Sequence, residues 1–143
     1  MMTLPQYQRV GYEPIDREHD ALTRSLQLLI QEVCDSNLVA ADAHLTILME
    51  QLDRHFQSEE ALMASSHYPL QARHTEAHRG FTRDAARHIA AFREYGLTPE
   101  FRRWVLERFS KWFDFHIRAN DVALGRHLRD HPTTTPQAGL VAR

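Results

Sequence analysis

Two pairs of residues in the sequence have the types and the spacing of metal ligands. His55 and Glu59 are four residues apart, and so are His74 and His78. Residues four apart are separated by only about 40° around an α-helix, so both side chains of a pair can reach the same ion. Imidazole nitrogens and carboxylate oxygens are ligands that zinc, iron and related metals accept in proteins. Each pair alone is common, so its meaning depends on the polar residues that the fold places nearby.

Three further residues extend this candidate site. His19 and His116 each occupy a position where a helix that packs into a core would carry leucine or isoleucine. Asp121 follows His116 by five residues, a step of roughly 140° beyond one turn of an α-helix. Simple helical geometry therefore does not place these two side chains on one stripe, and they would have to reach a common centre from its two flanks.

Turn and capping signals divide the chain into four helices that must position these residues. The predicted helices run from about Pro14 to Val33, Val39 to Ala64, Pro69 to Glu94 and Pro99 to Arg129. Their inward stripes, with steps of three and four residues, are Ile15, His19, Leu22, Leu26, Leu29 and Val33; Leu38, Ala41, Leu45, Leu48, Leu52, His55, Glu59 and Leu62; His74, His78, Phe81, Ala85 and Phe92; and Val105, Phe109, Trp112 and His116. Helices of this kind with short connections predict an all-α, up-down-up-down four-helix bundle with a metal site in the bundle core.

The polar residues on these stripes need a reason to be buried. Burying them costs several kcal/mol unless they find hydrogen-bond partners or a metal. A single histidine on such a stripe is more often a hydrogen-bonded core residue than a ligand, but convergence from four helices favours ligation. Five imidazoles and two carboxylates exceed the needs of one ion. If two ions share both carboxylates and one oxo or hydroxo bridge, the ion with three histidines is six-coordinate and the ion with two histidines keeps one position open.

The composition is that of a single globular domain. The chain has 143 residues, 43% hydrophobic and 25% charged, with a net charge of −2, so it lacks the electrostatic signature of proteins that bind nucleic acid or anionic membranes. No apolar run approaches the ~20 residues of a membrane span, no secretory signal begins the sequence, and Cys34 is the single cysteine. We therefore expect a cytoplasmic protein with no nucleic-acid or membrane partner. One bundle over residues 1–130 and a flexible C-terminal tail over residues 131–143 are predicted.

Four segments together resemble the hemerythrin family: IDREH at 15–19, HFQSEEALM at 55–63, HYPLQARHTEAHRGF at 67–81 and WFDFHIRAND at 112–121. The resemblance covers about residues 10–130 in the same order and spacing. It implies two iron ions (Fe2+/Fe3+) joined by an oxo or hydroxo bridge, with His74, His78 and His116 on one iron and His19 and His55 on the other. It also implies that Glu59 and Asp121 bridge both irons, and that the diferrous centre binds O2 reversibly, as peroxide, at the open iron.

Apolar residues flank the predicted ligands and are expected to wall the O2 pocket: Leu22, Phe56, Trp112, Phe113 and Ile117. Such a wall would slow the entry of water and the loss of bound peroxide, although the same residues would pack in any bundle core. Phe113 stands where the family usually has leucine, so we expect it to narrow the pocket. The tryptophan that commonly precedes the first helix in the family is absent.

The leading functional hypothesis is reversible O2 binding for carriage, storage or delivery to an oxygen-using enzyme, which would make the chain a binding protein rather than a catalyst. One alternative is an O2 or redox sensor in which the N-terminal segment or a helix shifts and signals to a partner protein. Another is a di-iron enzyme that removes peroxide or nitric oxide at the open iron. A structural or storage site for another metal such as zinc is the remaining alternative.

Other charged residues and histidines are predicted to lie outside the site. Glu60 and Asp20 stand beside ligands in the sequence but are expected to point to solvent. Surface, capping or core positions are expected for the other histidines, which are His44, His67, His88, His127 and His131.

Overall fold

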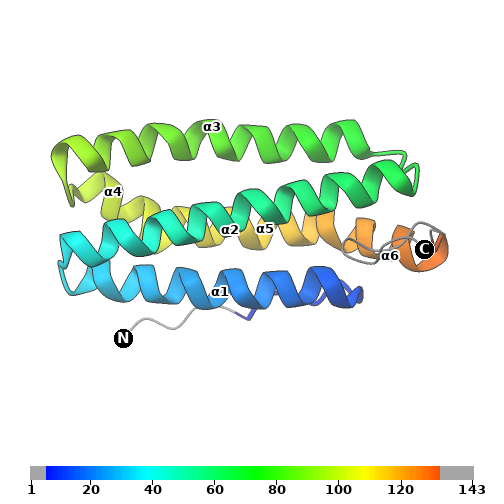
Figure 1. The fold of residues 1–143 in the computed structure, drawn as a ribbon, viewed down its shortest axis with the longest axis horizontal. Coiled ribbons are helices and arrows are strands. Elements are labelled where there is room, and N and C mark those ends of the chain that lie inside the picture. The colour runs from blue at the N-terminus through cyan, green and yellow to red at the C-terminus, as the bar shows by residue number, and fades with distance from the viewer. Residues whose placement is uncertain (1–5, 133–143) are drawn as a thin grey trace, which may run out of the picture.

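The computed structural model describes residues 6–132, which form helices and connecting turns without any strand (Figure 1). Three long helices come first, α1 (Glu13–Cys34), α2 (Leu38–Ser65) and α3 (Gln71–Tyr95). The fourth rod of the bundle consists of α4 (Pro99–Arg103), η1 (Trp104–Arg108), α5 (Phe109–His116), η2 (Ile117–Asp121) and α6 (Val122–Asp130). Each rod runs antiparallel to the one before it, so the predicted up-down-up-down four-helix bundle is confirmed. The predicted tail lies, from residue 133 onward, outside the described residues.

Side-chain caps and a glycine mark the ends of three helices. The Asn37 side chain accepts a hydrogen bond from the Ala40 amide at 3.1 Å and caps α2. Thr98 does the same for α4, accepting from the Phe101 amide at 3.1 Å. Gly96 ends α3 with φ of 78°, a backbone conformation that favours glycine. The third helix begins two residues later than predicted, because the chain first makes a turn in which the Gln71 amide donates to the Tyr68 carbonyl at 3.2 Å.

The fourth rod is not the continuous α-helix predicted over Pro99–Arg129. Two of its turns, Trp104–Arg108 and Ile117–Asp121, are π-helical. In each of them, the amide that follows the turn donates to the carbonyl five residues earlier. Such a turn is wider than an α-helical turn and changes which later residues face the core. The consequence for the candidate site is described below.

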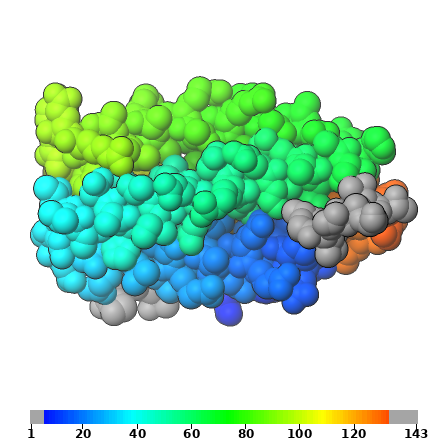
Figure 2. Space-filling model, in the orientation of Figure 1, coloured from blue at the N-terminus to red at the C-terminus, as the bar shows by residue number. Residues whose placement is uncertain are grey.

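Apolar stripes hold the rods together. In the space-filling view, the side chains of α2 fill the space between α1 and α3 (Figure 2). The stripes predicted for the first and third helices are confirmed, because all of their residues are buried. Leu38 is wrong as a core residue: it is 49% exposed, since it is the first residue of α2 and lies at the end of the bundle. In the described part of the chain, no helix is long and apolar enough to cross a membrane.

The segment before α1 joins the first rod to the last. The buried carboxylate of Asp16 accepts a hydrogen bond from the Val10 amide at 2.8 Å. The Val10 carbonyl in turn accepts from the Arg129 guanidinium at 2.7 Å. Gly125 in α6 lies directly against this segment, and a Cβ there would be 2.6 Å from the Val10 carbonyl oxygen. A glycine at this position therefore allows the close approach of two backbones.

Replacing Gly125 by alanine is expected to lower the free energy of unfolding by about 1–3 kcal/mol, because the added methyl group overpacks against Val10. Gly80 in α3 is the matched control, since a Cβ there would meet only the Arg83 guanidinium at 4.0 Å. At such an open helical position the change to alanine raises stability by about 0.5–1 kcal/mol. Urea denaturation of both variants measures the difference. Equal stabilisation by Gly125→Ala and Gly80→Ala would contradict the packing described here.

Candidate metal centre

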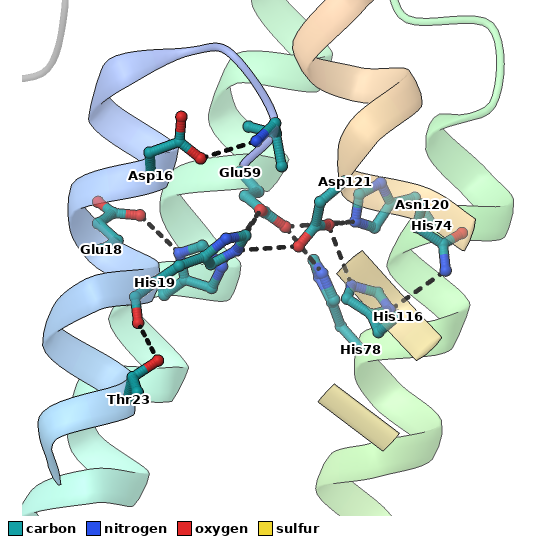
Figure 3. Close-up of polar contacts among 12 residues, drawn as sticks. Asp16, Glu18, His19, Thr23, Glu59, His74, His78, His116, Asn120 and Asp121 are labelled. Atoms are coloured by element: carbon teal, nitrogen blue, oxygen red, sulfur yellow. Dashed lines mark hydrogen bonds and ion pairs between the residues drawn. The ribbon is translucent and has the colours of Figure 1, made fainter. Parts of the chain in front are cut away.

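All of the residues predicted as ligands meet in the middle of the bundle (Figure 3). They are His19 from α1, His55 and Glu59 from α2, His74 and His78 from α3, His116 from α5 and Asp121 from η2, and each is at most 3% exposed. Figure 3 shows the imidazole rings arranged around the two carboxylates. The seven residues form two groups of possible metal ligands, one with three histidines and one with two, and both groups contain Glu59 and Asp121.

The two carboxylates divide their oxygens between the groups. On the side with two histidines, His55 Nε2 lies 3.1 Å from Glu59 Oε2, and His19 Nε2 lies 3.0 Å from Asp121 Oδ2. The other oxygens, Glu59 Oε1 and Asp121 Oδ1, face the remaining histidines. A carboxylate that presents one oxygen to each of two ligand groups has the geometry of a bridge.

The side with three histidines is equally compact. His74 Nε2 lies 3.2 Å from Glu59 Oε1 and 3.0 Å from Asp121 Oδ1. His78 Nε2 is 3.1 Å from Glu59 Oε1, and His116 Nε2 is 3.2 Å from Asp121 Oδ1. All three rings therefore direct the same nitrogen, Nε2, toward the same pair of oxygens.

The π-turn explains how Asp121 reaches this centre. In an α-helix, a step of five residues would rotate its side chain away from that of His116. The amide of Val122 instead donates to the carbonyl of Ile117, which widens the turn between the two residues. His116 and Asp121 then project to the same side, and their approach from two flanks of the centre, expected from α-helical geometry, was wrong.

Several polar atoms in the centre are buried without a hydrogen bond. Among the described residues, these include the Nδ1 atoms of His19 and His74. Those that face the other ligands are the Nε2 atoms of His19, His55, His74 and His116, together with Glu59 Oε2 and both Asp121 carboxylate oxygens. They are close to one another but lack hydrogen-bonding geometry. Leaving such groups unpaired costs about 1–3 kcal/mol each, whereas a cation at their point of convergence would satisfy them together. The donor set of imidazoles and carboxylates fits zinc or first-row transition metals such as iron.

Ion pairing controls the pKa values on the side with two histidines. Burial alone would lower the pKa of His55, but the carboxylates of Glu59 and Glu18 outweigh it and raise this pKa to about 10. Burial would raise the pKa of Glu59, yet the charge of His55, whose Nε2 lies 3.1 Å from Glu59 Oε2, holds it well below its usual range. In the metal-free protein at neutral pH, the His55 ring is therefore protonated on both nitrogens and positively charged. A metal that binds its Nε2 must displace the proton on that atom.

On the side with three histidines, the pKa values of the histidines do not all shift in the same direction. Burial opposes charge on His74, while its close contacts with the carboxylates of Asp121 and Glu59 raise its pKa to about 9. The pKa of Asp121 is lowered because contacts with His116, His19 and His74 outweigh its burial and the charge of Glu59. The pKa of His116 is lowered, chiefly by burial.

Three polar side chains contact the outward nitrogen, Nδ1, of the clustered histidines. Glu18 Oε1 lies 2.6 Å from His55 Nδ1, and Glu60 Oε2 lies 2.9 Å from His78 Nδ1. The third, the Asn120 amide, lies 3.2 Å from the Nδ1 atom of its neighbour His116. Partners of this kind fix the orientation of a ligand ring and increase its basicity.

The expectation that Glu60 points to solvent was therefore wrong, since its carboxylate turns along α2 to reach a ring on α3. Asp20 does face solvent, where it pairs with Arg9 at 2.6 Å. Glu18 and Asn120 were not predicted from the sequence to contact the ligand rings. The four-residue step from His116 to Asn120 could have indicated the second of these, but Glu18 contacts a different helix and leaves no local signal.

Aromatic rings cover the outside of the ligand cluster. The Phe56 ring stacks on His78 with centroids 3.9 Å apart, and the Trp112 ring stacks on His116 at 4.6 Å. Phe113 meets His19 edge to face at 5.3 Å. Leu22 and Ile117, the other two residues predicted to wall a pocket, are buried in the core. The three aromatic rings therefore place apolar surface against the ligand cluster.

The remaining histidines with described contacts lie outside the cluster. His127 Nε2 donates to the Ser66 carbonyl at 3.0 Å, and His88 stacks on Trp104 with centroids 5.0 Å apart. His44 lies 3.6 Å from a carboxylate oxygen of Glu32. The structural roles expected for them agree with these contacts.

A helical bundle with a buried imidazole from every rod and two buried carboxylates among them belongs to the class of cation-binding four-helix proteins. The sequence model of one family, Hemerythrin, described as the Hemerythrin HHE cation binding domain, matches residues 10–128. The chain belongs to the hemerythrin family. No curated protein and no solved structure matches it.

Removing the carboxylate that holds His55 is expected to weaken metal binding. We expect Glu18→Ala to reduce the affinity for Fe2+ or Co2+ by about 10–100-fold, because His55 loses the partner of its Nδ1 atom. Competition with a chromophoric chelator measures the affinity. The matched control is Asp20→Ala on the same helix, which removes an exposed carboxylate paired with Arg9 rather than with a ligand ring. Equal affinities of the two variants would exclude this role of Glu18.

Proposed function

We propose that this protein binds O2 reversibly at two iron ions held by the seven clustered residues. The division of the Glu59 and Asp121 oxygens between a group of three histidines and a group of two is the observation that carries the proposal. Two ions bridged by both carboxylates would then differ by one protein ligand. The ion next to His19 and His55 would keep a position for an external ligand.

The ligand set favours reversible binding over oxidation chemistry. When bound, the iron pair supplies the two electrons that reversible O2 binding requires. Five neutral imidazoles and only two carboxylates leave the ions more positive than the carboxylate-rich sites of ferritin-like proteins, so higher oxidation states are disfavoured. With only two anionic carboxylate ligands, the irons are less readily oxidised further, so bound O2 can be released unchanged.

The residues around the centre exclude water from the proposed binding position. Phe113 covers His19 from the side, and its ring is in turn covered by Tyr7 at a centroid distance of 5.0 Å. Phe56 contacts His55 and stacks on His78. An apolar, closed environment of this kind slows proton delivery and the loss of a reduced oxygen species. We therefore propose carriage, storage or delivery of O2, with an oxygen-using enzyme as the recipient in the case of delivery.

Sensing is a second candidate, and one contact favours it. The N-terminal segment reaches the centre through the Phe113 ring, because Tyr7 contacts Phe113 and Phe113 contacts the His19 ring. The Tyr7 hydroxyl also bonds to Ser110 Oγ at 2.7 Å. A change at His19 could therefore move this segment and be read by a partner protein. We propose residues 1–130 as the functional domain in either case.

Metal analysis and optical spectra of the same sample test the proposal. We expect two irons per chain and a visible absorption band that appears when O2 is admitted to the anaerobically reduced protein and disappears when O2 is removed. Conversion to a stable oxidised form without reversal would favour the sensor or an enzyme. A preparation that folds but binds no iron after anaerobic reconstitution would refute the di-iron assignment.

Phe113→Leu is expected to speed autoxidation of the oxygenated protein several-fold. The change removes the ring that meets His19 edge to face and opens space for water beside it. The rate is measured from the decay of the visible band in air-saturated buffer. Leu128→Met serves as a control for core substitution, because Leu128 is a buried residue of α6 outside the ligand shell. An unchanged rate in Phe113→Leu would exclude a gating role for this ring.

A further inference from the structure

A cavity of about 220 Å³ lies between residues 6–9 of the N-terminal segment and α1. Residues at positions i, i+3, i+4 and i+7 of α1 form its helical wall, and Figure 3 shows three of them along the helix. They are Asp16, His19, Asp20 and Thr23. The volume is enough for a cation with its first shell of water, since six waters take about 180 Å³ at ~30 Å³ each.

The cavity borders one residue of the metal-binding cluster. His19 is among its lining residues, and the other six clustered residues are not. The Nε2 atom of His19 lies 3.0 Å from Asp121 Oδ2, whereas its Nδ1 atom is buried and has no hydrogen-bond partner within residues 6–132. In His55, the other histidine on this side of the centre, the Nδ1 atom is held by Glu18. His19 therefore has an unpaired nitrogen on a ring that borders open space.

The same cavity also reaches the solvent. The Asp20 side chain is 47% exposed, whereas the His19 side chain is 4% exposed. These two residues are adjacent in the sequence, and both line the cavity. A solute that arrives at Asp20 from the solvent is therefore one residue away from a buried ligand.

The lining of the cavity has an excess of carboxylates. Asp16 and Asp20 are opposed by one cation, Arg9. Residues 13–20 contain four acidic residues and one basic residue, and residues 13–65 as a whole contain eleven acidic and three basic residues. The small net charge of the whole chain hides this concentration of negative charge on α1 and α2. A cation is therefore attracted to the side of the bundle that carries the cavity.

Arg9 is the one lining residue that would repel a cation, and it is weakly held. Its side chain is 61% exposed, with Nη1 2.6 Å from Asp20 and Nε 3.9 Å from Asp16. Ion pairs as exposed as this are weak, because water and salt screen them. A divalent cation, with twice the charge, could therefore replace the guanidinium at Asp20.

We propose that this cavity is the route by which a hydrated divalent cation enters the metal centre. Asp20 receives the cation at the surface, and His19 is the first of the seven clustered residues that it meets. The proposal requires that the cluster binds a divalent cation, but it depends neither on O2 binding nor on iron. It would remain valid if the centre held zinc.

The rate of Co2+ uptake by the metal-free full-length chain tests this route. Co2+ changes its visible absorption when imidazoles and carboxylates replace its water ligands, so stopped-flow mixing follows its arrival at the cluster. We expect the rate to rise with Co2+ concentration and to fall as added salt screens the attraction. Mixing the loaded protein with an excess of chelator measures the rate of release.

Two charge variants should change the uptake rate in opposite directions. Asp20→Asn brings the charge of the lining from −1 to zero and should slow uptake at low salt by about three- to tenfold. Arg9→Gln brings it to −2 and should speed uptake by a similar factor. Release should slow in Asp20→Asn as uptake does, because a route affects both directions, so the equilibrium affinity should be nearly unchanged. The matched control is Asp42→Asn, which removes an equally exposed carboxylate paired with Arg93 at 3.3 Å on α2.

A steric variant tests the path itself. Thr23→Phe should fill the cavity from α1 and slow uptake several-fold at both low and high salt. Its matched control is Thr46→Phe on α2. Both threonine hydroxyls donate to the carbonyl four residues earlier, at 2.8 Å in Thr23 and 3.0 Å in Thr46, so both variants lose the same kind of hydrogen bond. Circular dichroism and the amount of Co2+ bound at saturation establish that each variant is folded.

Three results would overturn the proposal. The first is equal uptake rates in Asp20→Asn and Asp42→Asn, and the second is wild-type uptake by a folded Thr23→Phe. The third is a rate that does not depend on Co2+ concentration and is the same in all folded variants, because entry would then require opening of the whole bundle. Each of these results leaves the O2 test unaffected, since that test is read from the visible band of the iron-loaded protein.

Discussion

The burial of five imidazoles and two carboxylates in the middle of an apolar bundle is the constraint on which the rest of the structure depends. Polar groups in this position destabilise the fold unless they are partnered, and several of their atoms here have no hydrogen bond within the described residues. The leucine-rich parts of the stripes must offset this cost in the metal-free chain. Because a bound cation would satisfy the same atoms, metal binding and folding are thermodynamically linked in this protein.

The surroundings of the cluster divide into two kinds of contact with different consequences. Carboxylates and an amide hold the outward nitrogens of His55, His78 and His116, which fixes the orientation of these rings. Aromatic side chains cover the ring faces and edges and exclude water. Polar contacts therefore set where the ligand atoms point, and apolar contacts set the environment in which they act.

The fourth rod contains two π-turns, and one of them positions a residue of the candidate metal centre. Turns of this type are rare, and they often occur at functional sites. The turn at Ile117–Asp121 brings Asp121 Oδ1 to within 3.2 Å of His116 Nε2, and the turn at Trp104–Arg108 lies earlier in the same rod. The helix thus departs from regular geometry where Asp121 joins the candidate metal centre.

The sequence by itself determined the four rods, their order and the residues of the cluster. Helical stripes and four-residue pairs are local properties, so His55 with Glu59 and His74 with His78 could be assigned to common faces from spacing alone. The position of Asp121, the partnership of Glu18 and Glu60 with rings on other helices, and the split of the carboxylate oxygens were decided only by the tertiary structure. The position of Asp121 depends on a π-turn, which departs from the regular period of 3.6 residues. The other features depend on how helices distant in sequence pack together, and that period contains no information about such packing.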